Sequence, residues 1–196
     1  MVPHRSRLLP VVLLAAVCAF GVLDALMKGH HGGTRNAIGN VSAPWALIPF
    51  LAAAFIRPRR AIFGPFIGAL STVAALASYS LVRAARSGSP HRYAEMSLTS
   101  MDNRWFLLGI FGGAVLGALG ALLAERRKWA AIGMLTASLL VLEPVARIIW
   151  ALVMGEPPRT LIPSPGVWAL EVLCGGVGLF AFHVCFARAH HALNRE

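Results

Sequence analysis

The sequence predicts an all-α fold, a polytopic bundle of six transmembrane helices that forms one integral membrane domain over residues 1–196. Hydrophobic residues make up 57% of the chain, charged residues make up 13%, and the mean hydropathy is +0.68. A soluble domain has roughly a quarter of its residues charged. The apolar residues also gather in blocks of a length that crosses a bilayer, which takes about 20 residues per helix.

The apolar blocks set the expected helix boundaries. We expect helices over residues 8–27, 41–56, 61–82, 105–124, 129–153 and 166–187. Helices are favoured because lipid cannot satisfy a free backbone, and because the blocks lack the alternation of membrane barrel strands. The second block is the shortest and contains Pro44 and Pro49, so we expect it to be kinked or to begin near Ala37.

The short loops predict the orientation of the chain. The turns at residues 57–60 and 125–128 are strongly basic, and basic residues accumulate on the cytoplasmic side of a membrane. We therefore expect a multi-pass protein of the plasma membrane with both termini in the cytoplasm and the loop at 83–104 outside. All five tryptophans lie near block ends, where they would anchor the helices at the lipid headgroups. The long first block favours a retained helix over a cleaved signal peptide.

Charge and cysteine usage exclude several classes of partner. The formal net charge of +10 would suggest nucleic acid in a soluble protein, but here the cations lie in short clusters between apolar blocks, where lipid headgroups account for them. We expect the lipid bilayer as the partner and no nucleic acid. The cysteines form no CxxC pair and the paired histidines lack further ligands, so neither a metal site nor a cofactor is expected.

Glycine spacing predicts close helix packing. Gly109, Gly113 and Gly117 recur every fourth residue in the fourth block, and Gly64 and Gly68 do so in the third. Small residues on one face let helix backbones approach closely in lipid. Two interpretations stay open: packing within one bundle, and an interface with another membrane protein or a second copy.

Ionisable residues inside the apolar blocks are the functional lead. A charge near the bilayer centre costs roughly 2.5–3.5 kcal/mol on insertion scales, so such residues face an interior or a cavity. Counted along the helices, four of these ionisable residues lie in the outer half of the expected bundle, at levels similar to those of Ser42 and Tyr79. The candidate ligand or proton site consists of Asp24, Glu143, Arg147 and Glu171.

Glu143 and Arg147 are four residues apart on one helix face, which predicts an ion pair. Pro144 between them removes a backbone hydrogen bond and favours a kink. The three carboxyl groups exceed the single guanidinium by two negative charges, which a proton or a cationic ligand would balance. A structural ion pair and a ligand or proton site therefore remain as alternatives.

Enzyme motifs are mostly absent, so whether the chain is an enzyme is left undecided. HExxH, GxSxG and P-loop motifs do not occur. The run from Glu143 to Arg147, followed by His183, is similar to the intramembrane prenyl-protein proteases. That family has paired glutamates before the arginine, whereas Leu142 stands in the first of these positions here.

Several stretches resemble a family of uncharacterised six-helix actinobacterial integral membrane proteins. They are the run Asn-Ala-Ile-Gly-Asn-Val-Ser-Ala-Pro-Trp at 36–45, Arg-Pro-Arg-Arg at 57–60, Arg-Trp-Phe at 104–106 and Glu143-Pro144. The likeness covers nearly the whole chain and implies a membrane protein with no assigned activity. The architecture, with Ala15 and Ala19 on the first helix, is also similar to the substrate-binding subunits of energy-coupling vitamin transporters, whose ligand pocket opens outward.

Two functions from different classes follow. In the first, the outer charges line a site for a small ligand or a proton, and the protein is a carrier or the binding subunit of one. In the second, the protein is an accessory component that docks another membrane protein through its glycine-rich helix faces.

Overall fold

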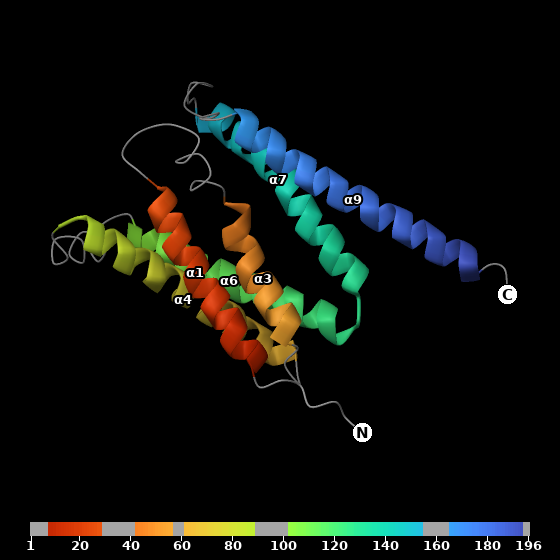
Figure 1. Ribbon diagram of the computed structural model, residues 1–196, viewed down its shortest axis with the longest axis horizontal. Coiled ribbons are helices and arrows are strands. Elements are labelled where there is room, and N and C mark those ends of the chain that lie inside the picture. Colours follow the sequence, from red (N-terminus) through yellow and green to blue (C-terminus); the bar gives the residue numbers. More distant parts are fainter. Residues whose placement is uncertain (1–7, 29–41, 57–60, 89–101, 155–164, 194–196) are drawn as a thin grey trace.

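Six α-helices make up most of the computed structural model, which describes residues 8–28, 42–56, 61–88, 102–154 and 165–193 (Figure 1). In the described residues no strand occurs, so the predicted all-α class is confirmed. Each predicted block coincides with one helix, and a 3₁₀ turn, η1, leads into α4. The elements are α1 (Leu8–Met27), α3 (Ala43–Ile56), η1 (Ala61–Phe63), α4 (Gly64–Arg86), α6 (Asp102–Glu125), α7 (Trp129–Met154) and α9 (Pro165–Leu193).

Five of these helices are long and apolar enough to cross a membrane, namely α1, η1 with α4, α6, α7 and α9. Their outward side chains are apolar and exposed, as a lipid-facing surface requires. Phe66 on α4 is 67% exposed and Val153 on α7 is 74% exposed. The chain is therefore a helical membrane protein.

Helix α3 is the short member of the bundle. Its 14 residues span about 21 Å, which is less than the roughly 30 Å of the hydrocarbon layer. Its side chains are among the most buried of the described residues: Phe50 is 1% exposed, and Ala53 and Ala54 are fully buried. One side of α3 is thus covered by protein, whereas Phe55 remains 49% exposed. It continues through Pro49, and the expected earlier start near Ala37 lies outside the described residues.

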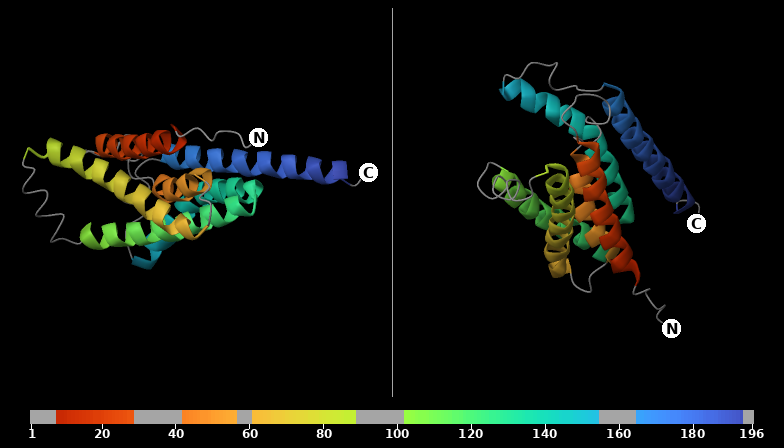
Figure 2. Two further views of the ribbon diagram at one scale, coloured as in Figure 1. Left: turned by 90° about the horizontal axis from the view of Figure 1, so that it is seen from below. Right: turned by 60° about the vertical axis from the view of Figure 1, so that its left-hand side comes forward.

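The helices form two groups. Helix α4 packs against α1 and α6, and α3 packs against α6 and α4, which gives a four-helix group. Helices α7 and α9 form a hairpin beside it (Figures 1 and 2). Among the described elements α9 contacts α7 alone, while α7 reaches the four-helix group through α3 and α6.

Successive helices run in opposite directions, so the beginning of α1 and the end of α9 lie on the same side of the bundle (Figure 1). The opposite side gathers the end of α1, the beginning of α3, the end of α4, the end of α7 and the beginning of α9. Which of the two sides faces the cytoplasm stays a prediction from the basic turns.

The glycine rows of α4 and α6 face one another. A Cβ atom on Gly117 would lie 2.7 Å from the Cα atom of Gly68, and one on Gly64 would lie 2.6 Å from the Cβ atom of Ala121. A Cβ atom on Gly113 would collide with the hydroxyl group of Thr72. These glycines therefore let the two backbones touch. Gly109 differs, because its nearest neighbour, the Cγ2 atom of Thr72, would be 3.9 Å away.

Two local features shape the hairpin. Helix α7 continues through Pro144 and changes direction along its length (Figure 2, right). Before it, α6 ends in a turn in which Arg127 has a φ of 56°. The Lys128 N–H donates to the Leu123 carbonyl at 2.9 Å and the Arg127 N–H to the Ala124 carbonyl at 3.1 Å. This is a Schellman ending with arginine where glycine is usual.

Candidate functional site

The N-terminal end of α3 is held by a carboxylate from another helix. The backbone N–H groups of Ser42 and Ala43 donate to Oε1 and Oε2 of Glu143 on α7. The first N–H groups of a helix have no partner within it, and the helix dipole favours a negative charge there. Glu143 supplies the acceptor for these groups at the N-terminal end of α3.

Arg147 completes this contact, which we call the α3 clamp (Ser42, Ala43, Glu143 and Arg147). Its Nε atom donates to Oε1 of Glu143 at 2.8 Å, and its Nη2 atom donates to Oγ of Ser42 at 2.6 Å. The side chain of Glu143 is 8% exposed. The ion pair expected from the spacing of Glu143 and Arg147 is present, and it joins α7 to α3.

Glu171 on α9 lies beside the α3 clamp. Its carboxyl group is within interaction range of both Glu143 and Arg147. The residue is 8% exposed, and its Oε1 atom is buried with no hydrogen bond. Three of the four residues of the predicted site, Glu143, Arg147 and Glu171, therefore lie together. They contribute two carboxyl groups and one guanidinium group.

Asp24 belongs to a separate cluster near the end of α1, so the structure divides the predicted site in two. Its carboxylate pairs with Nζ of Lys28 at 3.1 Å and interacts with the indole of Trp45. Asp24 is 6% exposed. The ammonium group of Lys28 lies 4.9 Å from the ring centroid of Tyr79, within the range of a cation–π contact.

Arg86 ties α1 to α4 at the same end of the bundle. Its Nη1 atom donates to the carbonyl oxygen of Ala25 at 2.9 Å and to that of Lys28 at 3.4 Å. The last carbonyl groups of a helix lack partners within it, and a basic side chain can cap them. The sequence placed Arg86 in an outer loop, whereas the structure places it in the last turn of α4.

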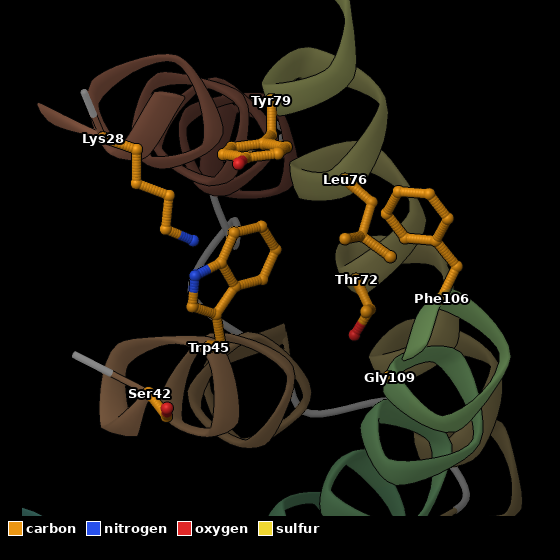
Figure 3. A pocket seen from close by; sticks show the side chains of 8 residues that line it. All are labelled: Lys28, Ser42, Trp45, Thr72, Leu76, Tyr79, Phe106 and Gly109. Atoms are coloured by element: carbon orange, nitrogen blue, oxygen red, sulfur yellow. The ribbon is translucent and has the colours of Figure 1, made fainter. Parts of the chain in front are cut away.

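A cavity of about 360 Å³ lies between α1, α3, α4 and α6 (Figure 3). Aromatic and aliphatic side chains form most of its wall, together with one ammonium group and the hydroxyl groups of Ser42, Thr72 and Tyr79. We call it the aromatic cavity. Its lining consists of Lys28, Ser42, Trp45, Thr72, Leu76, Tyr79, Phe106 and Gly109.

The two charge clusters border the aromatic cavity from different sides. None of the four residues of the predicted site is among its lining residues. Each cluster reaches it through a neighbour: Lys28 is the partner of Asp24, and Ser42 belongs to the α3 clamp. In Figure 3, Lys28 extends toward Trp45, and Trp45 faces Thr72 and Leu76 across the open space.

Trp45 is held in place by other aromatic rings. Its centroid is 5.1 Å from that of Phe20 and 6.0 Å from that of Tyr79, with interplanar angles of 75° and 81°. This edge-to-face geometry is favourable for aromatic pairs. The ring of Trp45 packs against side chains of α1 and α4 and forms a wall of the cavity; that it anchors the chain at the lipid headgroups stays a prediction.

Sequence reasoning missed most of the cavity. Lys28, four residues after Asp24, carried a usable signal, since that spacing favours an ion pair on a helix. No sequence signal pointed to the other lining residues Thr72, Leu76, Phe106 and Gly109 as part of a cavity. The sequence of an apolar membrane helix does not reveal which of its faces meets a cavity.

The arrangement defines a helical membrane protein with an aromatic cavity and two buried charge clusters near one end of its bundle. Residues 2–193 match the family of unknown function DUF6518, and the chain belongs to this family. No curated protein and no solved structure matches the chain. The family assigns no activity, so the function has to be argued from the site.

Proposed function

We propose that this protein binds a small ligand in the aromatic cavity and serves as a membrane carrier or as the ligand-binding subunit of one. The observation that carries the proposal is the cavity itself, which is bounded by four helices. Its volume of about 360 Å³ falls within the range of roughly 300–1,000 Å³ that is usual for small-molecule sites. Such sites combine mainly apolar walls with a few placed polar groups.

The wall indicates the chemistry of the ligand. Trp45, Tyr79 and Phe106 offer ring surfaces, which suit a ligand with a flat apolar part. Lys28 reaches the cavity, whereas its partner Asp24 is buried behind it. An acidic or other hydrogen-bond-accepting group of the ligand would therefore lie next to the ammonium group, with the apolar part between the rings.

The proposed side of entry follows from the basic turns. With residues 57–60 and 125–128 in the cytoplasm, the end of the bundle that holds the cavity faces outward. The ligand would then enter from outside the cell, with both termini in the cytoplasm and the protein in the plasma membrane.

Two glycine substitutions on α6 test the proposal. A Cβ atom on Gly109 meets nothing closer than 3.9 Å, and Gly109 lines the cavity. A Cβ atom on Gly112 meets nothing within 4 Å, but Gly112 is not a lining residue. Gly109→Leu should therefore fill the cavity without breaking the bundle, and Gly112→Leu is its matched control.

The measurement is the identification, by mass spectrometry, of small molecules released from the purified full-length protein. We expect the same compound from the unchanged protein and from Gly112→Leu, and its loss from Gly109→Leu. Release of no compound from any of the three, or equal release from all three, would contradict a ligand site in this cavity.

The second function, docking a partner through glycine faces, has less support. Gly64, Gly68, Gly113 and Gly117 pack against one another's helices between α4 and α6. A partner would have to separate these two helices before it could use the same glycines.

A further inference from the structure

The buried charges beside the aromatic cavity do not balance. Glu143 and Arg147 form one ion pair, and Glu171 lies next to both. Arg147 already donates to Glu143 and to Ser42. If both buried carboxyl groups were ionised, the group would hold two negative charges against one positive charge, that of the partly exposed Arg147.

No other charged group among the described residues compensates Glu171. Of the described helices only α7 packs against α9, and the charged groups of α7 near Glu171 are those of Glu143 and Arg147. The N–H groups that begin α3 are bound by Glu143. The Oε1 atom of Glu171 is buried and accepts no hydrogen bond. A buried carboxylate in this setting is unfavourable, and two carboxyl groups that share a site normally hold a proton between them.

We propose that Glu143 and Glu171 together hold one proton, and that this proton keeps the N-terminal end of α3 attached to α7. With the proton bound, the group has one negative and one positive charge, and Glu143 stays free to accept the N–H groups of Ser42 and Ala43. Without the proton, Glu171 repels Glu143 and competes with it for Arg147, which weakens the α3 clamp.

The proton site is also linked to the aromatic cavity. Ser42 lines the cavity and belongs to the α3 clamp. Trp45, another lining residue, lies in the first turn of α3, and its N–H donates to the carbonyl oxygen of Ser42 at 3.0 Å. Release of the clamp would therefore move one wall of the cavity. The proton site itself does not depend on any ligand being bound there.

Infrared spectroscopy of the full-length protein in lipid nanodiscs tests for the proton. At neutral pH and without sodium, the unchanged protein should show the carbonyl band of a buried protonated carboxyl group. Glu171→Gln should abolish the band. Glu143→Gln should abolish it too, because Glu171 then ionises against Arg147. The control Glu125→Gln, at an exposed position, should retain the band.

Three results would overturn the proton site. They are absence of the band from the unchanged protein, its persistence in both Glu143→Gln and Glu171→Gln, and its disappearance when sodium is added, which would mean that a metal cation occupies the site.

Hydrogen–deuterium exchange tests the effect on the clamp in the same samples. The peptide that contains Ser42 and Ala43 should lose protection as pH rises, after correction for the intrinsic exchange rate. In Glu171→Gln, which has no second carboxyl group to ionise, its protection should not change with pH. An equal pH response in both proteins would show that the proton does not hold α3 in place.

Discussion

Glu143 on α7 accepts a hydrogen bond from the backbone N–H of Ser42, which lies 101 residues earlier in the chain. This contact solves a specific problem. The first N–H groups of a helix have no partner within it and need an acceptor from elsewhere. The acceptor comes from the α7–α9 hairpin, which among the described residues also meets the four-helix group through contacts of α7 with α6 and with the other end of α3, where Trp129 stacks on Phe55. The α3 clamp therefore fastens the two parts of the bundle together.

Removal of Arg147 should destabilise the protein strongly. Arg147→Met leaves two buried carboxyl groups without a cation, and loss of one member of a buried ion pair typically costs about 3–5 kcal/mol. Glu143→Gln should cost less, about 1–3 kcal/mol, because Glu171 can then pair with Arg147 while the N–H groups of α3 lose their acceptor. The free energies of unfolding in detergent micelles measure both effects. The double variant should lose less than the sum, and strict additivity would show that the two side chains do not act together.

Gly113→Leu should be among the most damaging single changes in the bundle. Its side chain would force α6 away from Thr72 and Gly68 on α4, and overpacking of this kind costs about 1–3 kcal/mol or more. Gly112→Leu, one residue earlier, has free space and should change stability by no more than about 0.5 kcal/mol. Thermal unfolding in detergent compares the two. Equal unfolding temperatures would mean that the two helices are not in close contact.

Arg127→Gly should stabilise the protein. Arg127 has a φ of 56°, and a left-handed conformation costs about 1–2 kcal/mol for residues other than glycine. Arg126→Gly is the control, because Arg126 does not have a positive φ and should gain nothing. Chemical unfolding measures the difference. A loss of stability in Arg127→Gly would mean that its side chain makes contacts that outweigh the backbone strain.

The orientation can be tested with two exposed positions at opposite ends of the bundle. Ser87 follows α4 and Glu125 ends α6, and both are exposed. In a background with alanine at positions 18, 174 and 185, a membrane-impermeant maleimide added to intact cells should label Ser87→Cys and leave Glu125→Cys unlabelled. The reverse pattern would place both termini outside.

The apolar blocks predicted which segments are helices, since each block is long and its flanks are basic or rich in turn residues. Helix ends were less predictable. The third helix continues past residue 82 to Arg86 because Arg86 binds the end of α1. Helix α3 begins at Ala43, where Glu143 accepts its first N–H groups. Each of these two helix ends depends on a contact between distant parts of the chain. Local sequence patterns carry no information about such contacts.

The candidate site was predictable only where its residues lie close together in the sequence. The four-residue spacing on a helix revealed the Glu143–Arg147 pair. The aromatic cavity uses residues from four helices, and membrane helices are apolar on all sides, so hydrophobic periodicity does not identify their inner faces. The separation of Asp24 from Glu171 depends on helix neighbours and could not be predicted for the same reason.

The most direct test of the central claim, a ligand cavity that opens to water inside a membrane bundle, uses two leucines of α4. Leu76 lines the cavity, whereas Leu70 is 53% exposed on the apolar outer surface. In the same alanine background, a small charged thiol reagent added to intact cells should modify Leu76→Cys but not Leu70→Cys, and Gly109→Leu should block the reaction at position 76. If Leu70→Cys reacts and Leu76→Cys does not, the outer surface faces water, the cavity is closed, and the account is contradicted.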